Sequence, residues 1–335
     1  AFCSEINFGD VPLSEEQSAF LDDWNNEVLQ LCKTLPESVQ TDALLFFMQY
    51  SGLSFGMRLD FFRTFYVPTW SLVYWLLNQT PTQTPSSPKD AVLSMRAHAM
   101  AMFLHALDDH LHDQEMPITH LTLLLRSQAW MIMNEAFGEL SNGIDGGQAI
   151  VSQCIDAYYA AITNQKDVDS LNAYCSLFKN QMATGMIVPT LLTKKITENE
   201  SLGLSVQSAF GSFGIAWRLL DDIKDLEKDV MKKEHSSIYI CLPREAKKLW
   251  NRDSGADGRS KAKHLERIVE YLLAGGVVEI LIDRICRELE AAADIADRLE
   301  MTGLGSELRS LSGPLGSLQR GDDRGHAARN ARLRS

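Results

Sequence analysis

Apolar residues recur at intervals of three and four along most of the chain, a spacing typical of amphipathic helices. The pattern extends from residue 14 to residue 311, and no apolar/polar alternation between tight-turn dipeptides indicates strands there. The spacing predicts helices over residues 20–35, 90–107, 119–140, 149–162, 170–192, 202–226, 260–273 and 277–299. We therefore expect an all-α protein, a single bundle of at least these eight helices.

Helix-terminating residues separate the predicted helices. Pro36 follows the first helix, the sequence NQTPTQTPSSP predicts a loop over 78–88, and SNGIDGG over 141–147 ends another helix. Gly275 and Gly276 separate the last two helices, and the polar segment 251–259 predicts a surface loop. We predict one domain over residues 1–312. Residues 313–335 are rich in Arg and Gly, a composition that predicts a disordered tail.

Charge and cysteine content narrow the class of protein. The 335 residues carry a formal net charge of −12, which argues against a nucleic-acid partner, because such a partner requires a basic surface. The 6 cysteines include no C-x-x-C pair, which fits free thiols in a reducing cytoplasm. The sequence has neither an uninterrupted apolar stretch long enough to span a membrane nor a signal-peptide pattern. We expect a cytoplasmic protein without membrane insertion.

Two clusters of aspartates follow directly after apolar helical segments. The first follows MAMFLHAL and contains Asp108, Asp109 and Asp113, and the second follows FGIAWRLL and contains Asp221, Asp222, Asp225 and Asp229. Aspartates four positions apart share one helix face and repel one another. Carboxylates at the end of a buried helix are costly unless a cation neutralises them. Mg²⁺ fits this need, because it takes oxygen ligands and completes its shell with water and substrate phosphate oxygens. The clusters therefore predict two walls that hold a diphosphate through Mg²⁺ ions, which stabilise the departing diphosphate as Lewis acids. A single acidic cluster would more often be a solvated helix face.

The two clusters resemble the two aspartate-rich motifs of trans-isoprenyl diphosphate synthases and the related class I terpene synthases. The first motif of that family is D-D-x-x-D with variable spacing, and the second is D-D-x-x-D. The resemblance covers residues 40–300 and implies an isoprenoid-synthase helical bundle with a central cavity. It implies metal-binding roles for Asp108, Asp109 and Asp113 on one wall and Asp221, Asp222 and Asp225 on the other. It also implies about three Mg²⁺ ions per active site. Members of this family often form homodimers.

The resemblance also suggests residues that bind the diphosphate. Lys179 lies 42 positions before Asp221, near the place of a diphosphate-binding family lysine, although Asn180 replaces the Thr that usually follows. Lys232 or Lys233 lies near a second such lysine, and Arg218 replaces a usual Gln. We expect catalytic roles for Asp108, Asp109, Asp221 and Lys179, and substrate binding by Lys179, Lys233 and Arg218. Aromatic faces stabilise a migrating carbocation, and the candidates on the predicted helices are Phe103, Phe178, Phe210, Phe213 and Trp217.

Departures from the family pattern decide the expected reaction. Chain-elongating members bind isopentenyl diphosphate with a G-K-x-x-R-P stretch and with arginines after the first motif. Here Asp113 is followed by QEMP, with no Arg until Arg126. The N-terminal candidates, residues 56–59 and 63–68, do not restore the Lys and Arg. We therefore expect ionisation of one allylic prenyl diphosphate of farnesyl or geranylgeranyl length, followed by cyclisation or quenching to a terpene.

Three alternatives remain open. The first is a prenyltransferase, either chain-elongating or acting on another acceptor. The second is a zinc or iron site at His105, His110 and His112, although no cysteine or second histidine cluster completes it. The third is a non-catalytic subunit of a synthase heteromer, which would be expected to lose aspartates that this chain keeps.

Overall fold

The computed structural model describes residues 5–52, 60–78, 87–163, 168–197, 199–252 and 258–319, and every regular element in these ranges is a helix. The first half contains α1 (Glu15–Thr34), α2 (Glu37–Tyr50), the 3-10 helix η2 (Phe61–Thr64), α3 (Pro68–Asn78), α4 (Pro88–His112), α5 (His120–Ser141) and α6 (Gly147–Thr163). The second half contains α7 (Leu171–Gln181), α8 (Ala183–Thr197), α9 (Glu200–Lys224), α10 (Leu226–Lys232), α11 (Ser237–Cys241), α12 (Arg244–Trp250), α13 (Gly258–Ala274), α14 (Val277–Arg298) and α15 (Thr302–Gln319). The expected all-α bundle is confirmed.

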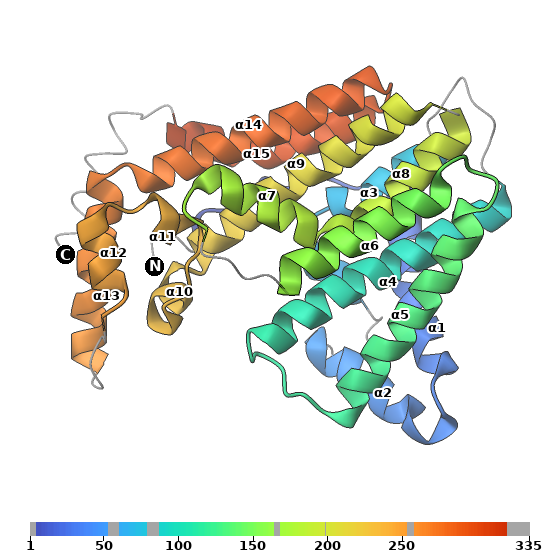
Figure 1. Ribbon diagram of the computed structural model, residues 1–335, viewed down its shortest axis with the longest axis horizontal. Helices are drawn as coiled ribbons and strands as arrows, with labels where there is room; N and C mark the ends of the chain where they lie inside the picture. Colours follow the sequence, from blue (N-terminus) through green and yellow to red (C-terminus); the bar gives the residue numbers. More distant parts are fainter. Residues whose placement is uncertain are drawn as a thin grey trace.

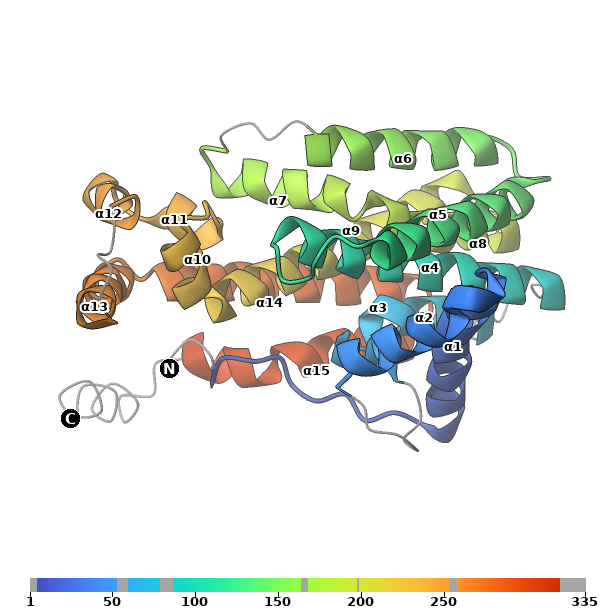
Figure 2. The same ribbon diagram turned by 90° about the horizontal axis from the view of Figure 1, so that it is seen from below.

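Helix α9 lies at the centre of the bundle. It packs against α14 on one side and against α8 and α7 on another, while α4 packs against α5 and α8 (Figure 1). The short helices α10, α11 and α12 gather with α13 at one end of the molecule (Figure 2). The segment before α1 runs along α15, where the backbone N–H of Gly9 donates to the carbonyl of Leu311 at 2.9 Å. Buried apolar residues from Ile6 to Leu315 form one hydrophobic core.

The eight predicted helices are present, but two of them are interrupted. The segment predicted over 170–192 divides at Met182 into α7 and α8, and the segment over 202–226 divides at Asp225 into α9 and α10. Near the first break, the backbone carbonyl of Met182 accepts a hydrogen bond from the N–H of Gly185, three residues later, at 3.0 Å. Pro189 lacks the N–H that would donate to the Gly185 carbonyl. The apolar spacing continues through both breaks, so periodicity alone does not reveal them.

The predicted helix stops are confirmed where they can be examined. Pro36 caps α2, α5 ends at Ser141, and Gly276 adopts φ +61° between α13 and α14, a conformation that suits glycine. Residues 79–86 and 253–257, which belong to the two predicted loops, lie outside the described residues.

The predicted boundary at residue 313 is wrong. Helix α15 continues to Gln319 and contains Pro314, and Leu315 is fully buried. Its Gly, Ser and Pro content masks a helical stripe of buried leucines, namely Leu304, Leu308, Leu311 and Leu315. Because these leucines cover α14 and α3, the helix is stabilised by packing rather than by propensity. Residues 320–335 lie outside the described residues.

Other expectations from the sequence can be checked in part. Five cysteines, Cys32, Cys154, Cys175, Cys241 and Cys286, are free thiols. Among the described residues, no helix combines the length and apolar character needed to cross a membrane. The central cavity that the family resemblance implies stays a prediction.

Candidate active site

Both aspartate clusters lie at the carboxyl ends of long helices. Asp113 caps the end of α4, and Asp225 caps the end of α9. The carboxyl end of a helix carries partial negative charge, which disfavours anions there. Each cluster therefore sits where its charge is most costly, and only a cation offsets that cost.

The two helix ends face one another. The side chain of His105, one turn before Asp109 on α4, meets Trp217 of α9 with ring centroids 6.0 Å apart. Burial is the largest cause that raises the pKa of Asp221 to about 6, against the opposing charge of Arg218. The charges of Asp225, of Asp222 and, across the interface, of Asp109 contribute to the rise. In the part of the chain that the structure describes, the side-chain carboxylates of Asp109 and Asp221 have no hydrogen-bond or ion-pair partner. Arg218 offsets part of the charge of Asp221, but no described side chain bonds to either carboxylate, so this pair keeps negative charge in the site.

Asp108 points away from α9. It accepts two hydrogen bonds from the guanidinium of Arg126 on α5, at 2.6 and 2.9 Å, and one from the hydroxyl of Tyr158 on α6 at 2.7 Å. A bidentate Arg–carboxylate pair with a third donor satisfies the carboxylate. The structure therefore joins Asp108 to α5 and α6 and does not bring it to the second cluster.

Asp222 is likewise occupied within its own wall. Its side chain is 2% exposed and lies 3.0 Å from the guanidinium of Arg218. It also accepts from the Tyr174 hydroxyl at 3.1 Å and from the backbone N–H of Ser237 at 2.9 Å. These contacts tie α9 to α7 and α11, so Asp222 and Arg218 support the wall from behind.

The remaining aspartates of the two motifs share one ammonium group. Lys228 of α10 donates to Asp113 at 2.9 Å and lies 3.5 Å from Asp225. Its ammonium is also 2.5 Å from Glu115, just after the first motif. Lys232, one turn further along α10, donates to the backbone carbonyl of Asp113 at 2.9 Å.

Asp229, the last aspartate of the second cluster, is 5% exposed. Burial raises its pKa to about 7, with the neighbouring charge of Asp222 as a second cause. Because the chain breaks at Asp225, Asp229 belongs to α10 and does not continue a stripe along α9.

We define the acidic site as Asp109, Asp113, Asp221 and Asp225. Among the described residues, no three His, Cys, Asp or Glu side chains converge closely enough to hold a metal ion alone. The donor set nevertheless fits Mg²⁺, which keeps water ligands and accepts phosphate oxygens to complete its shell. Two unpaired carboxylates, Asp109 and Asp221, offer the hard oxygen ligands for such an ion.

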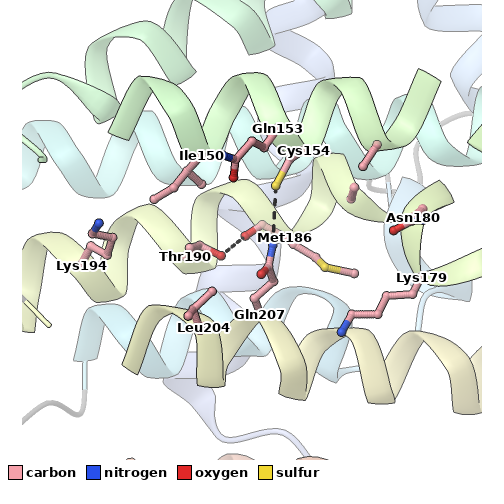
Figure 3. A pocket seen from close by; sticks show the side chains of 12 residues that line it. Ile150, Gln153, Cys154, Lys179, Asn180, Met186, Thr190, Lys194, Leu204 and Gln207 are labelled. Carbon is pink, nitrogen blue, oxygen red and sulfur yellow. Dashed lines mark hydrogen bonds between the residues drawn. The ribbon is translucent and has the colours of Figure 1, made fainter. Parts of the chain in front are cut away.

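Lys179 lies in a separate side pocket of about 250 Å³ between α6, α7, α8 and α9 (Figure 3). The stem of Lys179 rests on Gly211 of α9, where any side chain would collide with it. Gln153, Gln207 and Lys194 line the same pocket, and none of the cluster aspartates does. The structure does not bring Lys179 to the acidic site.

The other basic candidates occupy different places. Lys233 adopts a left-handed conformation at the end of α10, φ +59°, and its positive charge helps to lower the pKa of His264 on α13, which burial lowers most. Lys232 contacts the first motif at the carbonyl of Asp113. Residues 56–59 lie outside the described residues, and Arg63 lies in η2.

Three of the aromatic candidates lie beside the acidic site. Phe178 and Trp217 both contact the imidazole of His105 edge-on, with centroid distances of 6.2 and 6.0 Å. Phe213 neighbours Trp217 at 6.2 Å. Phe103 faces the opposite side of α4, where it packs on Phe47 and Phe61 in the core. Phe210 lies deeper, against His98.

The histidines do not support a zinc or iron site. The Tyr50 hydroxyl bonds to the Nδ1 of His110 at 2.6 Å, and the imidazole of His105 packs against Phe178 and Trp217. The described residues hold no histidine cluster with metal-ligand geometry.

Sequence reasoning missed several residues that hold the site together. Tyr158, Tyr174 and Lys228 each contact a motif aspartate. Only Lys228 carried a signal, because it lies three positions after Asp225 and thus on a neighbouring helix position. The two tyrosines lie on other helices, far from the aspartate-rich motifs in the sequence, so the motifs do not predict them.

Comparison with known proteins places the fold. The sequence matches no known family model and no curated protein. The structure is similar to heptaprenyl diphosphate synthase from Staphylococcus aureus, with 11% identity, a TM-score of 0.63, and coverage of 92% of this chain and 99% of that one. Geranylgeranyl pyrophosphate synthetase from the archaeon Geoglobus acetivorans gives 16% identity and a TM-score of 0.62, covering 90% and 99%.

A third similar structure is polyprenyl synthase from Caulobacter crescentus complexed with calcium and isoprenyl diphosphate. It gives 11% identity, a TM-score of 0.60, and coverage of 89% of this chain and 94% of that one. At such identities the likeness establishes the fold over nearly the whole length of both chains. The chain has the all-α fold seen in these prenyl synthase structures.

Proposed function

We propose that this chain is a divalent-metal-dependent prenyltransferase that ionises an allylic prenyl diphosphate between α4 and α9 and passes the allyl group to an acceptor. The single observation that carries the proposal is the pair Asp109 and Asp221. Two opposed carboxylates without a cation, at two helix carboxyl ends, are unfavourable unless a cationic or metal-bridged ligand completes them. The similarity to prenyl synthases, one of them complexed with calcium and isoprenyl diphosphate, supports this ligand class.

Mg²⁺, held by Asp109 and Asp113 from α4 and Asp221 and Asp225 from α9, would supply Lewis acidity for the leaving diphosphate. Lys228 and Lys232 of α10 adjoin the same carboxylates and would stabilise the diphosphate oxygens by charge-assisted hydrogen bonds. Asp222 and Arg218 would orient the second wall.

The allyl cation would form next to an aromatic wall. Trp217, Phe178 and Phe213 lie around His105, one turn from Asp109, and their faces would stabilise positive charge. The neutral form of His105 would accept a proton from the carbon skeleton once the new bond has formed.

Cyclisation to a terpene is the second candidate, and a specific observation favours it. After the first motif the chain presents Glu115, whose charge is taken by Lys228, and Arg126 is committed to Asp108. An incoming isopentenyl diphosphate needs cations at this place. Without such basic side chains, the carbocation formed from the allylic substrate would be quenched by its own double bonds or by water.

One assay separates the two candidates. The purified chain is incubated with Mg²⁺ and geranyl, farnesyl or geranylgeranyl diphosphate, each with and without isopentenyl diphosphate. A longer diphosphate that forms only with isopentenyl diphosphate establishes the prenyltransferase. A hydrocarbon or alcohol formed from one allylic substrate alone establishes the cyclase instead. No diphosphate release from any substrate, with an intact fold, contradicts both and favours a non-catalytic subunit.

A further inference from the structure

Lys228 occupies the place where the two aspartate-rich walls come together. Its ammonium lies 2.9 Å from Asp113 of the first motif and 3.5 Å from Asp225 of the second. Glu115 adds a third carboxylate at 2.5 Å. An ordinary surface lysine pairs with one carboxylate, whereas this ammonium is surrounded by three from two different segments.

The backbone geometry of both walls brings these groups together. Asp225 ends α9 and begins α10, so Lys228 follows it within the first turn of α10. On the other wall Gln114 adopts φ +58°, a left-handed conformation that a residue with a side chain rarely takes. This turn folds Glu115 back, so that its N–H donates to the carbonyl of His110 and its carboxylate meets Lys228.

The ammonium only partly neutralises the carboxylates around it. Asp109 and Asp221 lie on the same walls without a partner among the described residues, so the acidic site keeps excess negative charge. A monovalent, bulky ammonium is a poorer counter-ion for several converging carboxylates than a compact divalent ion. A divalent ion that binds Asp113 and Asp225 must, however, displace Lys228 from both.

We infer that Lys228 is an internal counter-cation, which joins the two walls and competes with divalent metal ions for Asp113 and Asp225. The inference rests on the proposed function and specifies how metal binding at that site is controlled. Metal binding frees the Lys228 ammonium, which then faces the diphosphate oxygens. Metal and diphosphate should therefore bind cooperatively. The metal ion takes over the carboxylates that Lys228 leaves, and the diphosphate pairs with the ammonium that the metal ion displaces.

The test measures metal binding to the full chain without substrate. Free Mn²⁺ is followed by its electron paramagnetic resonance signal during titration of the EDTA-treated protein. Lys228→Gln should lower the Kd for Mn²⁺ by at least about threefold, because a competing ion pair is lost. Lys228→Arg keeps the cation and should stay within about twofold of the wild type. Lys224→Gln is the matched control, since Lys224 precedes Asp225 but makes no ion pair among the described residues.

Each outcome is informative. Tighter binding by Lys228→Gln alone supports the inference, and so does binding that appears only in that variant. An unchanged or higher Kd in Lys228→Gln, or an equal gain in Lys224→Gln, overturns it and leaves the proposed function standing. The double variant Asp109→Asn with Asp221→Asn reports on the proposed function itself. If it binds Mn²⁺ as the wild type does, or if no variant binds, both proposals fail.

Discussion

Neighbouring carboxylates on a helix point about 100° apart, so Asp108 and Asp109 serve different parts of the molecule. Asp108 belongs to the ion pair with Arg126, which joins α4 to α5. Asp109 belongs to the acidic site, opposite Asp221. The same division occurs in the second motif, where Asp222 binds Arg218 and Asp221 does not share that contact.

This division predicts opposite phenotypes for adjacent substitutions. Asp109→Asn should lower kcat by at least about 100-fold with little change in stability, because it removes a ligand for the reacting diphosphate. Asp108→Asn should cost about 1–3 kcal/mol of unfolding free energy, because it weakens a charge-assisted network, and should retain more activity. Urea unfolding and steady-state diphosphate release measure the two effects. An Asp108→Asn variant as inactive as Asp109→Asn, at full stability, would contradict the assignment.

Asp229 predicts a dependence of stability on pH. Its folded pKa of about 7 lies above the ordinary aspartate value of 3.8, so its contribution to stability is fully present below pH 4 and is lost as the pH rises through 7. Asp229→Asn removes the cost of ionising a buried carboxyl group. The variant should match the wild type near pH 4 and exceed it at pH 8 by up to about 4 kcal/mol in EDTA.

Urea unfolding at pH 4, 6 and 8 measures that difference. Asp156→Asn on α6 is the control, since among the described residues the side chain of this aspartate makes no ion pair or hydrogen bond. A gap between Asp229→Asn and the wild type that is constant from pH 4 to pH 8 would show that the carboxyl group is not titrating as its burial implies.

At this scale the sequence predicts which residues carry charge but not which way they point. The two aspartate-rich motifs, D-D-x-x-x-D over 108–113 and D-D-x-x-D over 221–225, contain every aspartate of the acidic site. They could not separate Asp108 from Asp109, because the partners Arg126 and Tyr158 come from other helices. Lys179 fits the family spacing, yet its stem rests on Gly211 and its side chain lines the side pocket. The spacing alone does not reveal this direction.

At the scale of elements, one buried carboxylate holds three helices together. Glu307 of α15 accepts hydrogen bonds from Gln17 of α1 and from Ser71 and Trp75 of α3. Burial raises its pKa, while these three donors lower it. The contact fixes the first half of α15, just before the residues whose composition predicts a disordered tail.

Glu307→Ala should therefore destabilise the fold by about 2–4 kcal/mol, since it leaves buried donors without an acceptor. Differential scanning calorimetry should show a lower Tm with an unchanged single transition. Glu270→Ala on the exposed face of α13 is the matched control and should leave the Tm within experimental error. Equal Tm values for the two variants would mean that α15 does not depend on this contact.

Helices with a strong apolar stripe were predictable, and those with weak or mixed patterns were not. The predicted segment 277–299 matches α14 within one residue, because its buried face is continuous. The predicted segment 170–192 missed the break at Met182, since a local change of backbone direction leaves the apolar spacing intact. Helix α15 was missed beyond residue 312 because Gly, Ser and Pro dominate its exposed positions.

At the scale of the whole molecule, the acidic site joins two packing units. Helix α4 is packed on α5, and α9 is packed on α14, while α4 and α9 meet through aromatic contacts such as His105 with Trp217. The carboxylates repel one another across this interface and Lys228 offsets only part of that repulsion. A ligand that bridges the two walls should therefore stabilise the fold as well as take part in the proposed reaction.

Thermal unfolding tests this linkage without any turnover. Because a ligand that binds only the folded state adds about 2.7 kcal/mol at 100 times its Kd, Mg²⁺ with inorganic diphosphate should raise the Tm by several degrees. Mg²⁺ alone should raise it less, since the acidic site needs phosphate oxygens to complete the metal shell. The double variant Asp109→Asn with Asp221→Asn should start at a higher Tm, because the repulsion is gone, and should lose most of the ligand-induced increase. A ligand-induced increase that survives in this variant would place the diphosphate elsewhere in the molecule, with the side pocket around Lys179 as the first region to examine.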